Sequence, residues 1–175
     1  MRHVLSILIC SAALFCCTAS LGAQEIRRAP GWALPDSKMK VYDLADYRGK
    51  VVILEFIQTD CPHCAAFADI LRGVEQKYGP KIQIIGVAIA QHDTPNSVNA
   101  YITGHRVDYP VLLDSGQMAY SYMQEMHFAF PRVFVIDGNG MIRYDFKQDI
   151  TNKDVYEGNG LSVAIDHVLA DKGKR

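Results

Sequence analysis

Two cysteines separated by two residues, in Cys61-Pro62-His63-Cys64, are the most reactive groups in the sequence. They follow an apolar run and open a segment with helical periodicity, so the first sulfur is expected at a helix N-terminus. Free N–H groups and the helix dipole stabilise a thiolate there. Only a thiolate attacks a disulfide, and a second thiol one helical turn away can resolve the mixed disulfide. The spacing predicts a redox-active dithiol in which Cys61 attacks and Cys64 resolves.

The N-terminal segment is typical of an export signal. The basic start Arg2-His3 precedes the uncharged run 4–19, and Ala23 offers a small residue at a cleavage position. We therefore expect residues 1–23 to be a signal peptide and residues 24–175 to form one mature domain. This leader indicates an exported protein, which in bacteria would reach the periplasm.

The mature chain would keep only one pair of cysteines, because the other three precede the cleavage position. As a disulfide, this pair would close almost no loop and would constrain the unfolded chain little. As half of a zinc site, it would lack a second pair of cysteines. An active site without metal or organic cofactor is therefore the favoured interpretation. Two alternatives to cleavage after Ala23 remain: the N-terminal segment could stay as a membrane tether, or Cys16 or Cys17 could carry a lipid.

Charge and composition narrow the partners. Without Arg2, the 18 Lys and Arg become 17 against 19 Asp and Glu, a net charge of 17 − 19 = −2. A chain without basic excess is not expected to bind nucleic acid or an anionic membrane surface as its main partner. Its hydrophobic content of 49% is enough for one full core.

Apolar periodicity predicts alternating strands and helices followed by a hairpin, hence an α/β fold with a mixed central sheet and helices on both faces. The tight turn Asp137-Gly138-Asn139-Gly140 is the hairpin signal. Residues 24–34 are expected to be an irregular lead-in. The expected strands are 51–57, 82–89, 132–136 and 141–146, with short extended pieces at 39–44 and 109–113, and the expected helices are 65–78, 95–104, 116–126 and one at the C-terminus.

Glu55 is the one charged residue inside the apolar run 51–57. Its neighbours on the same face of the strand are apolar, so its carboxyl is expected to be buried, with a raised pKa. Such a group could take a proton from Cys64, or return it, near neutral pH. A glutamate that faces solvent at the strand end is the alternative.

Three segments resemble the thioredoxin-fold, exported thiol-disulfide oxidoreductases of the TlpA/ResA type. Gly49–Phe56 is similar to their approach to the active site, and Phe130–Ile142 to their cis-proline strand and hairpin. The segment between the second expected strand, 82–89, and Pro131 resembles the insertion that separates this branch from plain thioredoxin. The resemblance spans residues 30–170, and the chain departs from it at Asp60, where the family usually has tryptophan.

The resemblance implies a thioredoxin-like fold with this insertion before the cis-proline strand. It also implies a cis bond before Pro131, opposite the dithiol, and a backbone at Phe130 that pairs with an extended substrate. Glu55 matches the buried acid of thioredoxins. The implied partners are cysteine-containing exported proteins and a membrane or periplasmic thiol-disulfide protein.

The direction of exchange stays open at this stage. The overall resemblance favours a reductase, with cytochrome c maturation as one role. The Pro62-His63 spacer is more similar to that of the DsbA oxidases, which favours an oxidase. An imidazole at this position can stabilise the thiolate and so make the disulfide more oxidising. A peroxiredoxin-like peroxidase is one alternative, although Gln58 stands where those enzymes carry threonine or serine. A copper-binding, Sco-like protein is another, although its cysteines are spaced more widely.

Overall fold

The computed structural model describes residues 26–125 and 128–171. The expected signal peptide, residues 1–23, lies outside this part of the chain. Within the described residues, no helix combines the length and apolar character that crossing a membrane requires.

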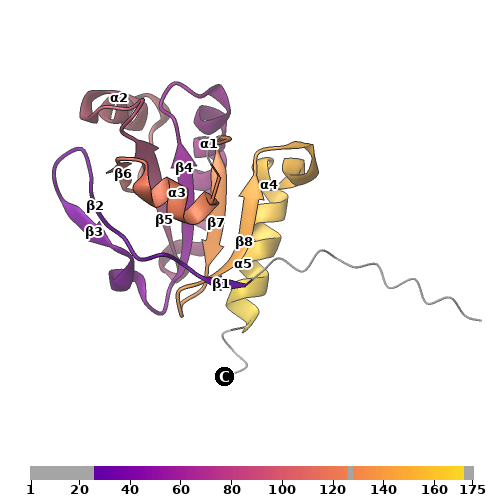
Figure 1. The fold of residues 1–175 in the computed structure, drawn as a ribbon. Coiled ribbons are helices and arrows are strands. Elements are labelled where there is room, and N and C mark those ends of the chain that lie inside the picture. The colour runs from indigo at the N-terminus through magenta and orange to yellow at the C-terminus, as the bar shows by residue number, and fades with distance from the viewer. Residues whose placement is uncertain (1–25, 126–127, 172–175) are drawn as a thin grey trace, which may run out of the picture.

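A six-stranded mixed sheet forms the centre of the fold, in the order β1-β8-β7-β4-β5-β6 (Figure 1). Strands β4, β5 and β6 are parallel, whereas β7, β8 and β1 add to the sheet antiparallel. A two-stranded sheet, β2-β3, lies beside it. The strands are β1 (Arg27–Arg28), β2 (Ala33–Pro35), β3 (Val41–Asp43), β4 (Val51–Ile57), β5 (Ile82–Ile89), β6 (Val111–Asp114), β7 (Arg132–Ile136) and β8 (Met141–Lys147).

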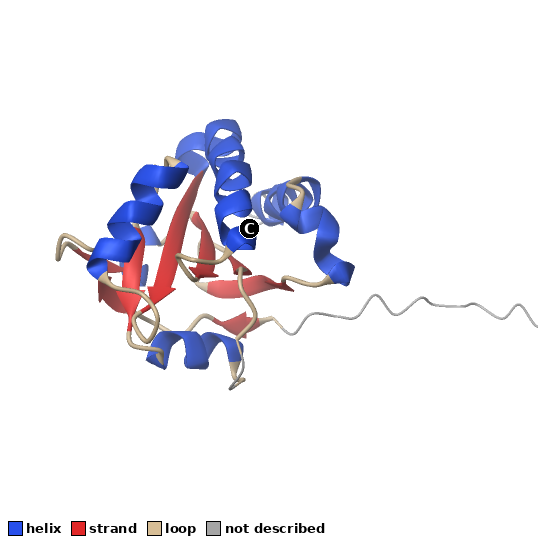
Figure 2. Ribbon diagram, turned by 90° about the horizontal axis from the view of Figure 1, so that it is seen from above, coloured by secondary structure: helices blue, strands red, loops and turns tan. Residues whose placement is uncertain are grey.

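Helices cover both faces of the sheet (Figure 2), as the alternating pattern predicted. Residues of α1, α2, α4 and α5 join the core on one face, and α3 joins the core on the other. The helices are α1 (Pro62–Tyr78), α2 (Pro95–His105), α3 (Gln117–Met123), α4 (Lys153–Tyr156) and α5 (Asn159–Asp171), with short 3-10 turns η1 (Leu44–Tyr47), η2 (Gly79–Lys81) and η3 (Ile150–Asn152).

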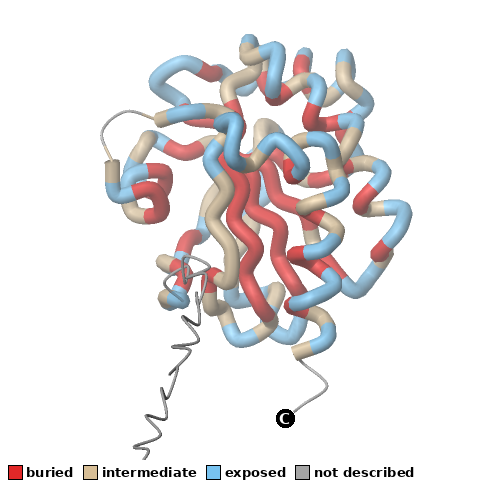
Figure 3. Tube along the Cα trace, turned by 90° about the vertical axis from the view of Figure 1, so that its right-hand side faces the viewer, coloured by how far each residue is buried: buried red, intermediate tan, exposed pale blue. Residues whose placement is uncertain are grey.

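Strand β4 is buried along its whole length because it lies between the two cores. Ile53 and Ile57 pack on the side of α1, whereas Leu54 packs on the side of α3. Burial of each such side chain contributes roughly 1.5–3 kcal/mol. Figure 3 shows the buried strands as a red band framed by half-buried and exposed segments. This strand delivers Glu55 into the interior and ends just before the dithiol.

Helix α1 begins earlier than its apolar pattern indicated, at Pro62 instead of residue 65. Cys61 is the N-cap, and proline suits the first helical position because its missing N–H has no partner there. Phe67 and Leu71 bury one face of the helix. Gly79, at the C-cap with φ 52°, ends it. The helix therefore starts at the dithiol itself.

The lead-in expected to be irregular contains two strands, so that prediction was wrong. Arg27 pairs with Ile142 of β8, and Leu34 pairs with Tyr42 of β3. Strands of two and three residues carry no readable periodicity, and their partners come from elsewhere in the chain. Helix α3 is also shorter than expected, because Gln124 takes a left-handed conformation (φ 55°) that ends it.

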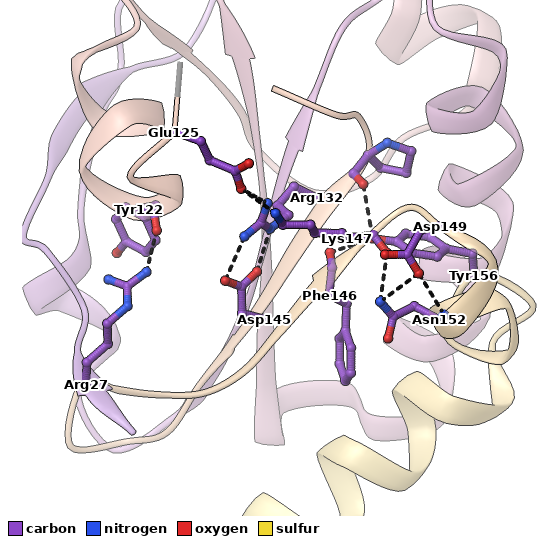
Figure 4. Close-up of polar contacts among 11 residues, drawn as sticks. Arg27, Tyr122, Glu125, Arg132, Asp145, Phe146, Lys147, Asp149, Asn152 and Tyr156 are labelled. Carbon is purple, nitrogen blue, oxygen red and sulfur yellow. Dashed lines mark hydrogen bonds and ion pairs between the residues drawn. The ribbon is translucent and has the colours of Figure 1, made fainter. Parts of the chain in front are cut away.

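Arg132, the residue after Pro131, is a buried cation that joins three segments (Figure 4). Its guanidinium makes a bidentate pair with Asp145 of β8, Nε–Oδ1 2.5 Å and Nη2–Oδ2 2.8 Å. Its Nη1 lies 2.7 Å from Glu125 Oε1, just after α3, and Lys147 Nζ lies 2.8 Å from the same oxygen. Arg132 thereby fastens the end of α3 and β8 to the start of β7.

Replacing Arg132 by glutamine removes the cation that both carboxylates share. We expect Arg132→Gln to lower the free energy of unfolding by roughly 1.5–3 kcal/mol, below the full cost of breaking a buried pair because Asp145 and Glu125 are partly exposed. The matched control is Lys147→Gln, whose exposed side chain should cost less than about 1 kcal/mol. Urea unfolding measures both, and equal losses would contradict the assignment.

Candidate active site

The two thiols differ sharply in exposure. Cys61, at the N-cap of α1, is half-buried, and Cys64, in the first turn, has an exposed fraction of 0%. The Cys61 amide donates a hydrogen bond to the Gln58 carbonyl (3.1 Å), which fixes the turn between β4 and α1. Solvent and partner proteins therefore reach the outer sulfur, whereas the inner one is enclosed.

The start of α1 provides an environment suited to an anionic sulfur. The first helical turn contains no acidic residue, and its leading N–H groups have no partner within the helix. Pro62 and His63 are both exposed, so the imidazole lies in solvent at the helix N-terminus. Asp60 is exposed as well. The redox-tuning roles of Pro62 and His63 stay predictions.

Glu55 lies in the middle of β4 with an exposed fraction of 0%. Tyr109 donates a hydrogen bond from its hydroxyl to Oε2 (3.2 Å), and the other oxygen, Oε1, is buried without a hydrogen-bond partner among the described residues. Burial raises the pKa of Glu55 to about 8, although the bond from Tyr109 works against the shift. The carboxyl can therefore gain or lose a proton close to neutral pH.

Cys64 occupies the same enclosed region. Burial first, and then the negative charge of Glu55, raise the pKa of its thiol. A thiol in this state attacks a disulfide only if a neighbouring base takes its proton. The predicted base is Glu55, whose charge acts on this thiol and whose pKa of about 8 lies close to neutrality.

Two buried tyrosines, Tyr101 and Tyr109, hydrogen-bond to the site from below Cys64 and Glu55, and the sequence did not identify them as site residues. The Tyr101 hydroxyl, from α2, donates to the Cys64 carbonyl (3.0 Å), and Tyr109 donates to Glu55. In the sequence, Tyr101 lies within the expected helix 95–104, and Tyr109 begins the expected extended piece 109–113. The rule that a buried carboxyl needs a donor could have indicated that a partner exists, but not which residue supplies it.

The loop before β7 forms the rim beside Cys61. The Phe130–Pro131 peptide bond is cis, and the Phe130 carbonyl oxygen lies 3.8 Å from Cys61 Sγ. The Tyr156 hydroxyl of α4 lies 3.0 Å from the Pro131 oxygen and 2.7 Å from the Phe146 oxygen (Figure 4). Tyr156 and the Arg132 pairs thus hold this loop from both sides, a role the sequence did not reveal.

A buried aspartate holds the opposite rim. Asp93, which follows β5, accepts hydrogen bonds on Oδ1 from the Thr59 amide (3.1 Å) and hydroxyl (2.5 Å). Thr59 lies in the turn that leads to Cys61, so the loops after β4 and β5 are joined at this point.

Metal-ligating side chains do not gather in the part of the chain that the structure describes. Across residues 26–125 and 128–171, no group of three or more His, Cys, Asp or Glu could hold a metal ion.

The order of the sheet, the dithiol at the start of α1 and the cis-proline loop beside it define a thioredoxin-fold protein. The chain belongs to the AhpC/TSA family, which matches residues 26–145.

Similar proteins carry names from thiol-disulfide chemistry. The thiol-disulfide oxidoreductase ResA of Bacillus thuringiensis subsp. konkukian (strain 97-27) is 24% identical over 163 residues, covering 89% of this chain and 91% of that protein. The thioredoxin-like protein YneN of Bacillus subtilis (strain 168) is 23% identical over 136 residues, 77% of this chain and 78% of its own.

Among solved structures, the putative thiol:disulfide interchange protein DsbE from Chlorobium tepidum superimposes with a TM-score of 0.67 at 24% identity. The match covers 81% of this chain and 98% of that one. The resemblance to the TlpA/ResA type and the thioredoxin-like fold are therefore both confirmed.

Glu55 should make the reduced protein less stable as pH rises. Its pKa is raised from 4.5 to about 8, so between these values the folded state keeps a proton that the unfolded state has released. The free energy of unfolding should fall across this window, by up to roughly 1.4 kcal/mol per pH unit, and level off above it. Glu55→Gln should remove the slope in urea titrations at pH 5, 6, 7 and 8. The exposed carboxyl of Glu157 supplies the control, Glu157→Gln, which should keep the slope. A wild-type slope retained in Glu55→Gln would contradict the assignment.

Proposed function

We propose that this chain is a thiol-disulfide oxidoreductase that exchanges its Cys61–Cys64 dithiol or disulfide with cysteines of other proteins. The observation that carries the proposal is the pairing of an accessible sulfur at a helix N-terminus with an enclosed one a turn later. The similarity to ResA and YneN supports the same chemistry.

Exchange in the reducing direction takes two displacements. The Cys61 thiolate attacks one sulfur of a substrate disulfide, the substrate S–S bond breaks, and the other substrate sulfur leaves as a thiolate. Cys64 then gives its proton to Glu55 and attacks the Cys61 sulfur, which releases the substrate sulfur that Cys61 had attacked. Two electrons pass to the substrate, and the chain keeps a Cys61–Cys64 disulfide.

The loop at Phe130 and Pro131 is the proposed binding surface for the substrate backbone. Because the Phe130 carbonyl faces the Cys61 sulfur at 3.8 Å, a peptide whose own sulfur meets Cys61 must pass along this loop. An extended segment can then pair with the Phe130 backbone as an added strand. This recognition is independent of side-chain sequence, which suits several client proteins.

Pro62 and His63 are the proposed determinants of the reduction potential. An imidazole at the start of α1 stabilises the Cys61 thiolate by charge or by a hydrogen bond, and a stabilised thiolate makes the disulfide more oxidising. The TlpA/ResA resemblance favours the reducing direction, and the Pro-His spacer favours the oxidising one. The same two displacements serve both directions.

We further propose that the protein is exported, on the basis of residues 1–23, and acts in a bacterial periplasm, free or tethered to the membrane. Its clients would be cysteine-containing exported proteins, with cytochrome c maturation as one route. A membrane or periplasmic thiol-disulfide partner would restore its redox state. No specific observation supports a peroxidase or a copper carrier. Gln58 stands where peroxiredoxins carry threonine or serine, and the described residues contain no group of three or more metal-ligating side chains.

Removing the resolving thiol should trap the first intermediate. Reduced Cys64→Ala, mixed with a peptide that contains one disulfide, should form a stable adduct through Cys61, measured by intact mass without reductant. The matched control, Cys61→Ala, keeps only the enclosed thiol and should form adduct at least roughly a hundred-fold more slowly, since burial withholds both access and thiolate. Adduct formation at similar rates in both variants would contradict the proposed function.

A further inference from the structure

We propose that Tyr109 is a positioning residue for Glu55: its hydroxyl holds one carboxyl oxygen and leaves the other as the acceptor for the proton of Cys64. The inference deepens the proposed function and rests on the part that Glu55 plays in it.

Tyr109 is placed so that its hydroxyl bonds to one oxygen of Glu55. The residue lies in the loop between α2 and β6, its side chain is buried, and its hydroxyl donates to Glu55 Oε2 at 3.2 Å. Of the described residues, it is the one that donates a hydrogen bond to this carboxyl. Oε1, equally buried, accepts none. The two oxygens of Glu55 therefore have distinct environments: Oε2 accepts the hydrogen bond from Tyr109, and Oε1 is buried and accepts none among the described residues.

A glycine on the neighbouring strand makes room for the tyrosine ring. Gly86 of β5 is the register partner of Glu55, so a side chain there would point to the same face of the sheet. A Cβ atom at Gly86 would lie 3.4 Å from Cε2 of Tyr109 and 3.2 Å from Cγ2 of Val111. Glycine weakens a strand interior and marks a close approach of another group. Here the approaching groups are the Val111 side chain, which is the closer of the two, and the Tyr109 ring, which packs over this position on its way to Glu55.

The other titratable groups around Glu55 cannot replace this bond. Burial, followed by the charge of Glu55, raises the pKa values of Cys64 of α1, Tyr101 of α2 and Tyr156 of α4, and none of these groups can be a cation. Tyr101 and Tyr156 direct their hydroxyls to backbone carbonyls instead. The charged form of Glu55 thus depends on the hydroxyl of Tyr109.

The test is Tyr109→Phe, which keeps the ring and removes the hydroxyl. The carboxyl stretch of protonated Glu55, identified by its loss in Glu55→Gln, can be titrated by infrared difference spectroscopy of the reduced protein. We expect its midpoint to rise by about one to two pH units, because a hydrogen bond to the charged form is lost. Resolution of a mixed disulfide at pH 7 should slow roughly ten-fold.

A matched control and a double variant separate positioning from general damage. Tyr122→Phe loses a buried hydroxyl on the opposite face of the sheet, where it donates to the Pro30 carbonyl (2.8 Å), and should leave the Glu55 midpoint unchanged. In the Glu55→Gln background, Tyr109→Phe should add no further slowing. An unchanged midpoint in Tyr109→Phe, or equal slowing in both backgrounds, would overturn the inference.

The infrared titration requires no disulfide substrate, so its outcome is independent of the Cys64→Ala trapping experiment on which the proposed function depends.

Discussion

Burial of the Glu55 carboxyl beside Cys64 is the interaction on which the rest of the structure depends. A desolvated carboxyl is costly in an apolar interior, and its pKa of about 8 is the measure of that cost. The same burial keeps Cys64 protonated, since desolvation and the nearby carboxylate act together on the thiol. In the proposed mechanism Cys64 is the proton donor and Glu55 the acceptor. The cores on the two faces of β4 bury both groups away from solvent.

The surrounding elements divide the remaining tasks. Helix α1 gives Cys61 a half-buried position at its N-terminus and a favourable electrostatic environment, while its first turn carries Cys64 inward. The loop at Phe130 lies against the outer sulfur and is held by Tyr156 on one side and by Arg132 on the other. The fold thus leaves the outer sulfur partly accessible and encloses the inner one.

Local patterns in the sequence predicted the parts of this arrangement that local forces determine. Strand β4, helix α1 and the hairpin after β7 follow from apolar periodicity and turn residues, and the dithiol follows from spacing alone. The contacts that refine the site are not local: Tyr109 meets Glu55 across 54 residues, and Tyr156 meets Pro131 across 25. Strands β1 and β2 were missed for the same reason, because their pairing depends on distant partners and not on their own composition.

The most direct test of the account is the lifetime of the mixed disulfide in Glu55→Gln. Stopped-flow reduction of a model disulfide, with intermediate and product followed separately, measures attack by Cys61 and resolution by Cys64 as two rates. Without the carboxyl, attack should proceed at the wild-type rate, and the mixed disulfide should persist roughly ten-fold longer or more. Equal slowing of both steps, or no change in either, would contradict the claim that Glu55 carries the proton of Cys64.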